Sequence, residues 1–282
     1  MNKSDIQLIL NQLKIDPKKY LGQNFLYDHN TIDKIIREAE ISENDVILEI
    51  GPGLGALTEK LLAQAKKVYA IEIQKEFCSF LTEKFANIPN LEIIHGDILK
   101  INLPCHNKVV SNIPYSITGP ILEKIFFKEE PSKGILTVET KIAERIFSTR
   151  GYNNLSRVTI SVNSFMDPIR KMKISPKGFF PEPKIKLSLI KLHPKKHLDS
   201  FLKDGITRRF YLNLIRGIMP YKNKDIINAL ELYIKNTEAL NLNKEELSEI
   251  LFQENYANNK LFQFKTKDFI NIAKKIYNRN KR

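Results

Sequence analysis

The sequence contains no tryptophan, only two cysteines and no run of eighteen apolar residues. Cys78 and Cys105 are too few for a disulfide framework or a four-cysteine zinc site, which favours a reducing cytoplasm. The five histidines lack the spacing of metal ligands, so no metal site is expected. The absence of a long apolar run excludes a membrane-spanning helix, and the first twenty residues do not resemble a signal peptide.

Acidic residues are scarce in the second half of the chain. Residues 151–282 hold 26 Lys and Arg against 12 Asp and Glu, a net charge of +14, whereas residues 1–150 hold 19 against 20, a net charge of −1. A surface with this excess attracts polyanions, and nucleic acid gains affinity there by releasing counterions. A lysine-rich composition that serves only solubility is the alternative. The asymmetry favours a nucleic-acid partner.

Short apolar runs alternate with helical patterns through the first 140 residues. The predicted strands begin at Asp45, Lys67, Leu91, Lys108 and Gly134. The segments with helical spacing are 30–39, 57–65, 75–85 and 121–127. Such alternation predicts βαβ units and an α/β fold, with a parallel sheet covered on both faces. Two further strands are predicted at 157–162 and 186–192.

Two domains are expected. Residues 1–194 form the α/β domain, in which 1–19 is a polar lead with one or two amphipathic turns. After a linker at 193–197, only helical patterns remain, so 195–282 is predicted to be a small all-helical domain.

A glycine-rich turn follows the first predicted strand. Gly51, Gly53 and Gly55 stand between this strand and a helix, where glycine permits positive φ and lets a ligand approach the backbone. Open α/β sheets bind ligands at this end of their strands. A dinucleotide fingerprint needs glycine at position 56, where this chain has Ala56. S-adenosylmethionine, a nucleoside with a compact charged tail, fits at least as well. A tight turn without a ligand is the alternative.

Two acidic residues end the next two predicted strands. Glu72 comes about twenty residues after the glycines, where a carboxylate accepts hydrogen bonds from both ribose hydroxyls. Asp97 ends the third strand, where a carboxylate accepts from an exocyclic adenine amine. Solvated strand ends or helix caps are the alternatives for each residue taken singly.

The sequence Asn112-Ile-Pro-Tyr115 ends the fourth predicted strand. The lone pair of an adenine amine is delocalised into the ring, so the amine is a poor nucleophile. The side-chain oxygen of Asn112 and the backbone carbonyl of Ile113 are acceptors that would localise this lone pair. Pro114 fixes the turn, and Tyr115 offers a ring for base stacking. The alternative is an Asn-x-Pro turn with a packed tyrosine.

These motifs, with Gly22-Gln-Asn-Phe-Leu26 before them, resemble the ribosomal RNA adenine N6,N6-dimethyltransferase family (KsgA-type). The resemblance covers about residues 18–194 and implies a Rossmann-like class I methyltransferase sheet, followed by a small helical domain that docks RNA. It implies S-adenosylmethionine as methyl donor and rRNA as partner. The donor-binding residues it implies are Gln23, Asn24, Leu26, Gly51, Gly53, Glu72, Ile73, Asp97, Ile98 and Asn112.

The resemblance also implies the catalytic set Asn112, Ile113, Pro114, Tyr115 and Phe179. In this family an aromatic residue before a Pro-x-Pro-Lys turn stacks on the flipped base opposite the tyrosine. Phe179 holds that place here, and Phe180 holds it if the register differs by one residue. Core packing is the alternative role for Phe179.

The length and the helical tail resemble the branch that dimethylates two adjacent adenosines in a small-subunit rRNA hairpin during ribosome biogenesis. The tail sequence from Leu240 to Leu247 resembles archaeal members. Three alternatives differ in class. One is a large-subunit rRNA methyltransferase of the macrolide-resistance type. Another is a non-catalytic ribosome assembly factor on the same fold, which has no need of Asn112 or the glycines, whereas this chain retains both. The third is a nicotinamide oxidoreductase, which would need glycine at position 56. A cytoplasmic monomer is expected.

Overall fold

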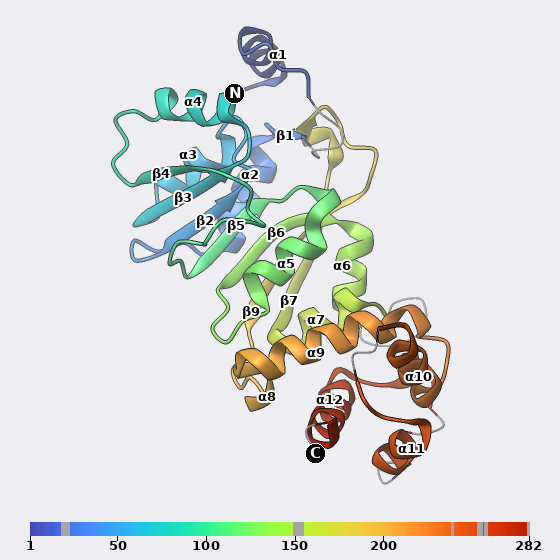
Figure 1. Ribbon diagram of the computed structural model, residues 1–282. Helices are drawn as coiled ribbons and strands as arrows, with labels where there is room; N and C mark the ends of the chain where they lie inside the picture. The colour runs from blue at the N-terminus through green and yellow to red at the C-terminus, as the bar shows by residue number, and fades with distance from the viewer. Residues whose placement is uncertain (18–22, 149–154, 238–239, 253–255, 257–258, 281–282) are drawn as a thin grey trace. The chain divides into compact units, whose positions relative to one another are not determined.

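The computed structural model describes residues 1–17, 23–148, 155–237, 240–252, 256 and 259–280 (Figure 1). Its strands are β1 (Phe25–Leu26), β2 (Val46–Ile50), β3 (Lys67–Glu72), β4 (Leu91–His95), β5 (Lys108–Asn112), β6 (Lys133–Glu139), β7 (Met166–Ile174), β8 (Phe179–Phe180) and β9 (Leu187–Pro194). Its helices are α1 (Lys3–Gln12), α2 (His29–Ala39), α3 (Ala56–Leu62), α4 (Lys75–Lys84), α5 (Thr118–Phe126), α6 (Thr140–Phe147), α7 (Arg157–Phe165), α8 (Ser200–Lys203), α9 (Gly205–Ile218), α10 (Ile226–Thr237), α11 (Lys244–Phe252) and α12 (Thr266–Asn280).

Seven strands form one sheet in the order β4-β3-β2-β5-β6-β9-β7 (Figure 1). The strands from β4 to β6 pair in parallel, and β9 runs antiparallel to β6. From β2 the chain builds outward through β3 and β4, then returns to place β5 on the other side of β2. Such a reversal of strand order leaves a crevice at the carboxyl ends of β2 and β5, where open α/β sheets bind their ligands.

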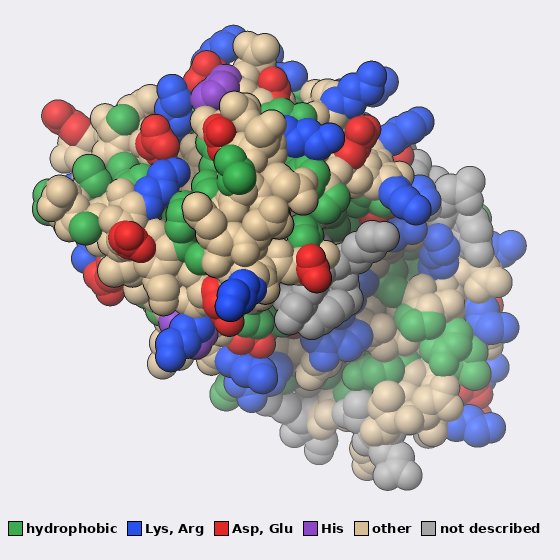
Figure 2. All heavy atoms as spheres, turned by 90° about the horizontal axis from the view of Figure 1, so that it is seen from above, with side chains coloured by type: hydrophobic (Ala, Val, Ile, Leu, Met, Phe, Trp, Pro, Cys, Tyr) green, Lys and Arg blue, Asp and Glu red, His purple; other side chains and the backbone are tan. Residues whose placement is uncertain are grey.

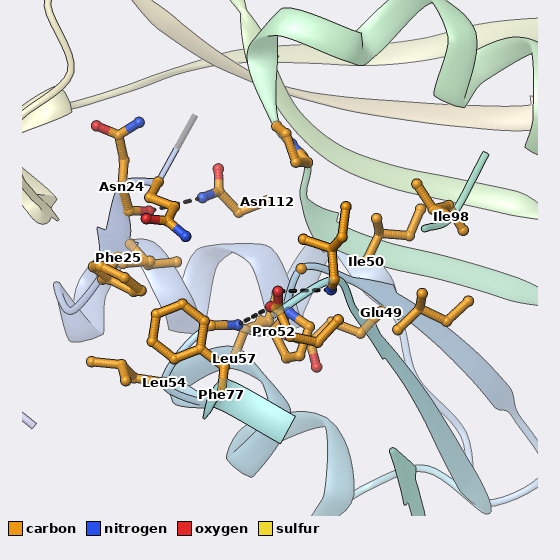
Figure 3. Close-up of a pocket in the computed structure, with 18 of the residues that line it drawn as sticks. Asn24, Phe25, Glu49, Ile50, Pro52, Leu54, Leu57, Phe77, Ile98 and Asn112 are labelled. Carbon is orange, nitrogen blue, oxygen red and sulfur yellow. Dashed lines mark hydrogen bonds between the residues drawn. The ribbon is translucent and has the colours of Figure 1, made fainter. Parts of the chain in front are cut away.

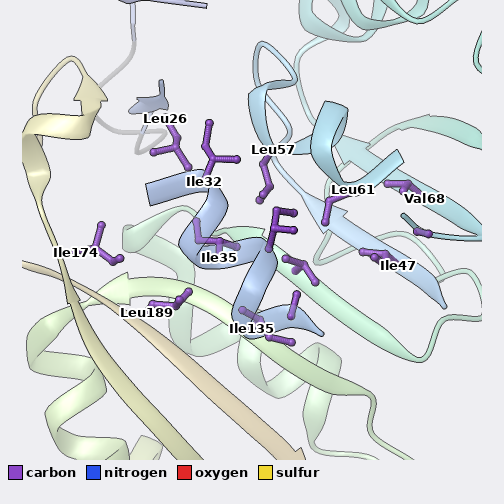
Figure 4. Packing of buried hydrophobic residues seen from close by; sticks show 14 of the residues in the cluster. Leu26, Ile32, Ile35, Ile47, Leu57, Leu61, Val68, Ile135, Ile174 and Leu189 are labelled. Carbon is purple, nitrogen blue, oxygen red and sulfur yellow. The ribbon is translucent and has the colours of Figure 1, made fainter. Parts of the chain in front are cut away.

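Helices α2 and α3 cover one face of this sheet. The Asp28 carboxylate caps α2 by accepting a hydrogen bond from the backbone of Thr31 at 2.8 Å. Its apolar residues Ile32 and Ile35 then face inward with helical spacing. They join a buried cluster that draws side chains from both helices and from strands β2, β3, β5, β6, β7 and β9 (Figure 4). This cluster anchors the strands whose ends carry the glycine turn.

The N-terminal lead is more ordered than its sequence suggests. Asn2 caps helix α1 in a capping box with Asp5. Ile6 and Leu10 are fully buried in a second apolar cluster, where Phe25, Leu54 and Phe77 complete the packing. The rings of Phe25 and Phe77 meet edge to face, with centroids 5.5 Å apart. Helix α1 thus supports the β1 segment and the turn that follows β2.

The chain forms two compact units. The first comprises residues 1–125, 132–143 and 168–193, and the second comprises 126–131, 144–167 and 194–282. The second unit therefore takes two segments from within 1–194 in addition to the tail helices. Its own core includes a hydrogen bond of 2.6 Å between the hydroxyls of Ser164 and Tyr211. Across the part of the chain that the structure describes, no helix is long and apolar enough to cross a membrane.

The predicted strands of the first 140 residues and the strand at 186–192 are confirmed as β2 to β6 and β9. The strand predicted at 157–162 is wrong, because these residues begin helix α7. Ser156 caps this helix. Six of its nine residues are buried, and they include serine and threonine as well as apolar residues. Packing against α9 and α12 overrides the β-branched composition. Helix α6, strand β7 and the small antiparallel pair of β1 and β8 were not predicted.

Candidate active site

One cavity opens at the carboxyl ends of β2, β3 and β5, within the first compact unit (Figure 3). All ten residues predicted to bind the donor line it, together with Pro114. They come from five places in the chain: the β1 segment, the glycine turn, the ends of β3 and β5, and the turn after β4. The strand order brings them together, since parallel strands end at the same edge of a sheet.

The glycine turn forms one wall of the cavity. Gly51, Gly53 and Gly55 have φ of +65°, +57° and +77°, a region that L side chains rarely adopt. A Cβ on Gly51 would meet no atom within 4 Å, which shows open space beside the backbone there. A Cβ on Gly55 would lie 2.8 Å from Leu81 and Phe85. The first glycine therefore leaves room for a ligand, and the third allows the turn to pack against α4.

Glu72 is held at the end of β3 by backbone donors. Its carboxylate accepts hydrogen bonds from Ile73 at 2.9 Å, Gln74 at 3.0 Å and Gly53 at 3.3 Å. The side chain is buried, and burial raises the pKa of Glu72 although the backbone donors oppose that change. The bond to Gly53 ties the end of β3 to the glycine turn. A carboxylate fixed in this way still has lone pairs to accept from hydroxyl groups of a ligand.

Asp97 and two isoleucines form the opposite wall. The Asp97 carboxylate accepts from the backbone of Leu99 at 2.9 Å, which orders the turn after β4. Gly96 donates to the backbone oxygen of Glu72 at 2.8 Å, so the ends of β3 and β4 are joined. Ile98 is buried, whereas the side chain of Ile73 is half exposed at 50%. An exposed apolar side chain and an acidic group at the edge of one cavity together suit the binding of a flat heteroaromatic ring that carries an amine.

Asn112 is oriented from both ends of its amide. Its nitrogen donates to the backbone oxygen of Asn24 at 3.3 Å (Figure 3). Its oxygen accepts from the Tyr115 hydroxyl at 3.1 Å. The donor and the acceptor together fix which side of the amide presents the oxygen. Burial raises the pKa of Tyr115 well above its usual value, so the hydroxyl keeps its proton and remains a donor. The amide of Asn112 thus lines the cavity in a fixed orientation, with its oxygen as an acceptor.

Only some of the predicted catalytic residues line the cavity. Pro114 lines it, and the side chain of Ile113 is buried as an anchor beneath the turn. Phe179 does not line it: this residue is 2% exposed, pairs with Leu26 across the β1–β8 sheet and lies in the main core cluster. Phe180 packs in the second cluster instead. The core alternative therefore describes Phe179 in this structure, and its stacking role stays a prediction.

Several cavity residues were not predicted. Phe25, Leu57 and Phe77 form an apolar part of the lining and come from β1, α3 and α4. Their sequence pattern is that of ordinary core residues, so no local signal marks them. Glu49 is different. It is an acidic residue inside an otherwise apolar strand, two residues before Gly51, so the sequence does carry a signal for it, although no role was predicted. Among the described residues no group of His, Cys, Asp and Glu is arranged to hold a metal ion.

Residues 15–267 match the family described as ribosomal RNA adenine dimethylase. The chain belongs to this family. A probable ribosomal RNA small subunit methyltransferase A from Methanococcoides burtonii is 39% identical over 220 residues, which are 78% of each chain. The ribosomal RNA small subunit methyltransferase A of Borrelia garinii is 32% identical over 277 residues, which are 97% of this chain and 93% of the relative.

Solved structures of related proteins share the fold of this dimethylase. A dimethyladenosine transferase from Plasmodium falciparum is 28% identical, with a TM-score of 0.74 over 88% of this chain and 95% of the other. The 23S rRNA methyltransferase ErmE has a TM-score of 0.62 over 90% of this chain and all of the other, at 21% identity. The chain thus has the class I methyltransferase fold that the resemblance implied.

The cavity of this dimethylase fits S-adenosylmethionine, the methyl donor. Open space beside Gly51 allows close approach to the backbone. The buried carboxylate of Glu72 is suited to the ribose hydroxyls, and Asp97 with Ile73 and Ile98 is suited to the adenine. When bound, the donor supplies a methyl group on a sulfonium, which is an excellent electrophile.

Proposed function

We propose that this dimethylase transfers methyl groups from S-adenosylmethionine to the N6 amines of two adjacent adenosines in a small-subunit rRNA hairpin. The observation that carries the proposal is the amide of Asn112, which lines the donor cavity and is held by a hydrogen bond at each end. The names of its relatives from Methanococcoides burtonii and Borrelia garinii support the small subunit as substrate. We place this activity in the cytoplasm, in ribosome biogenesis, and expect a monomer.

Positioning of the adenine amine is the central step. The Asn112 oxygen and the backbone oxygen of Ile113 accept hydrogen bonds from the two amine hydrogens, which draws the nitrogen toward tetrahedral geometry and localises its lone pair. No strong general base is required, because the sulfonium is already reactive. Orientation and preorganised acceptors then supply the rate.

The target base must leave its helix to reach this amide. An enzyme that modifies an exocyclic amine flips the nucleotide into a pocket and stacks the base on an aromatic ring. Tyr115 is three residues after Asn112 and half-buried, with its hydroxyl bonded to the Asn112 oxygen. Its ring supports the base beside the acceptors, with a stacking contribution of about 1–3 kcal/mol.

Both compact units carry an excess of positive charge, which attracts RNA. The second unit holds 22 Lys and Arg against 14 Asp and Glu, a net charge of +8, and the first holds 23 against 18, a net charge of +5. The excess of residues 151–282 is therefore shared, because segment 168–193 contributes to the first unit. In Figure 2, Lys and Arg side chains are scattered among acidic and neutral ones.

One cavity of the second unit concentrates basic groups. It is lined by Arg145, Arg157, Arg216 and Lys222. Burial lowers the pKa of Arg157, and the neighbouring charge of Arg216 adds to the effect. Like charges held together in this way are stabilised by a bound anion. We place an RNA backbone phosphate there.

The test is methylation of isolated small ribosomal subunits from cells that lack the gene, followed by mass spectrometry of the rRNA. Two neighbouring dimethyladenosines in small-subunit rRNA are expected. Methylation of a single adenosine in large-subunit rRNA would favour the large-subunit alternative. If the protein bound small ribosomal subunits without methylating their rRNA, the alternative of a non-catalytic assembly factor would be favoured.

A further inference from the structure

Glu49 is a buried acid in the wall of the donor cavity to which the proposed mechanism gives no role. It stands in β2, two residues before Gly51, and only 2% of its surface is exposed (Figure 3). Its Oε2 atom has no hydrogen-bond partner among the described residues, and neither has the hydroxyl of Thr58. Burying a carboxyl oxygen without a partner is costly, so such a group beside a cavity points to a ligand.

The surroundings of Glu49 favour its neutral form. Burial, together with the negative charge of Glu72 on β3, raises the pKa of Glu49 to about 8. Thr58 on α3 and Lys84 on α4 act in the opposite direction but do not cancel burial. Without a ligand, the group is therefore mostly protonated near neutral pH.

The methyl donor differs from the spent product by one positive charge. S-adenosylmethionine carries a sulfonium, an ammonium and a carboxylate, whereas S-adenosylhomocysteine has a neutral thioether in place of the sulfonium. Three acidic side chains line the cavity, and Glu72 and Asp97 are matched to neutral groups of the ligand, its ribose and adenine. Glu49 is the lining acid that remains to respond to the cationic part.

We propose that Glu49 senses the charge of the methyl donor: it releases a proton when the cationic donor binds and takes one up after the methyl group has left. This inference rests on the donor site of the proposed function and assigns a specificity role to a residue within it. The oxygen without a partner then gains one in the charged ligand.

The proposed role of Glu49 extends from methyl transfer to product release. Methyl transfer breaks the bond between sulfur and the methyl carbon, forms a bond between that carbon and the adenine N6, and releases one N6 proton to solvent. The sulfur keeps the electron pair and becomes neutral. Glu49 then no longer faces a sulfonium, regains a proton from solvent and holds the product less tightly than it held the donor. The cavity can thus exchange product for fresh donor before the second methyl transfer.

The experiment measures proton release by titration calorimetry in two buffers of different ionisation enthalpy. At about pH 7 we expect between half a proton and about one proton released per donor bound, and much less per S-adenosylhomocysteine. Both ligands carry the same α-amino group, which titrates near pH 8, so the difference between them isolates the sulfonium. Equal proton release for the two ligands would overturn the proposal.

Variants and pH give a second measurement. The dissociation constant of the donor should fall about tenfold or more between about pH 6 and pH 8, because the ionised form of Glu49 binds the cation. Glu49→Gln should remove most of this dependence and most of the preference for donor over product. Glu43→Gln, an exposed acid in the turn before β2, is the matched control and should keep both. A pH profile of Glu49→Gln that matches the wild type would contradict the role.

The outcomes separate this inference from the proposed function. Failure of the wild-type protein to bind the donor at every pH would overturn both. Donor binding and rRNA methylation without proton release would overturn the inference alone.

Discussion

The Tyr115 hydroxyl donates a hydrogen bond of 3.1 Å to the side-chain oxygen of Asn112, three residues earlier in the chain. The other end of the same amide donates to the backbone oxygen of Asn24, on the segment before β1. Two segments separated by 88 residues in sequence thus fix one acceptor atom. This arrangement leads to the first two predictions.

Tyr115→Phe removes the hydroxyl and keeps the ring. We expect kcat to fall about fivefold, because the loss of one orienting hydrogen bond costs about 1 kcal/mol, while KM for the RNA changes little. Tyr115→Ala also removes the stacking surface and should raise KM. Transfer of radiolabelled methyl groups into small ribosomal subunits measures both constants. A phenylalanine variant as impaired as the alanine variant would show that the hydroxyl matters more than the ring.

Asn112→Ala removes the acceptor itself. We expect methyl transfer to fall by at least about a hundredfold, since preorganised acceptors supply a large share of the rate, and donor affinity to weaken only slightly. Asn213→Ala, at an exposed position of α9, is the control and should leave both unchanged. Calorimetry with the donor and the methyl-transfer assay separate the two effects. Full activity in the Asn112 variant would contradict the lone-pair mechanism.

Glu72→Ala removes the carboxylate that accepts from three backbone groups and faces the cavity. Donor affinity should fall about tenfold to a hundredfold, because the ligand loses charge-assisted hydrogen bonds. Glu76→Ala, an exposed acid on α4, should bind the donor normally. Calorimetry measures the dissociation constants, and an unchanged value for the Glu72 variant would exclude its ribose role.

A buried ion pair stabilises the amino end of β2. Lys108 lies 2.7 Å from Asp45, and both side chains are at most 7% exposed. Lys108→Met leaves the Asp45 carboxylate buried without its cation and should lower the free energy of unfolding by about 3–5 kcal/mol. Lys67→Met, which breaks an exposed pair with Glu92, should cost less than about 1 kcal/mol. Urea unfolding followed by circular dichroism tests this difference.

The same pair makes stability depend on pH. Burial alone would raise the pKa of Asp45, but hydrogen bonds from Lys108, Ser42 and Asn107 outweigh burial and lower it to about 2. The unfolded carboxyl titrates near its ordinary value of 3.8, so the stabilisation is present above about pH 4 and is lost as the pH falls toward 2. Its size is about 2 kcal/mol. In Lys108→Met this loss should be smaller, and an equal loss would assign it to other groups.

Binding of a small-subunit rRNA hairpin should weaken steeply with salt, since phosphate contacts release counterions. Arg145→Gln combined with Arg216→Gln should lower the slope of log affinity against log salt by about 1, because both side chains line the cavity in which we place one phosphate. Lys235→Gln, an exposed basic residue on α10, is the control. Fluorescence anisotropy at several salt concentrations measures the slopes. An unchanged slope in the double variant would remove the basic cavity from the RNA surface.

Much of the cavity lining was predictable because it depends on local sequence and strand order. A glycine turn after one strand, Glu72 and Asp97 at the next two strand ends, and Asn112 at a fourth were enough to predict a common edge, and the structure brings all four into one cavity. Parallel strands leave few alternatives: once the βαβ alternation is recognised, their carboxyl ends must meet.

Other features depended on packing that no local pattern encodes. The β-branched residues at 157–162 suggested a strand, but contacts with α9 and α12 make this segment a helix. Tyr115 follows Pro114, and Phe179 lies two residues before Pro181, yet Phe179 is buried in the core and Tyr115 keeps its hydroxyl on Asn112. The positive charge of the second half is divided between two compact units because segment 168–193 returns to the first.

The sequence by itself determined the order of strands β2 to β6 and the residues that gather at their carboxyl ends. Only the tertiary structure decided that α1 packs beneath the cavity through Ile6 and Leu10, and that Glu49 is buried with one oxygen lacking a partner. The physical reason is that periodicity and turn chemistry act over a few residues. Burial and electrostatic environment are set by neighbours that are distant in the chain.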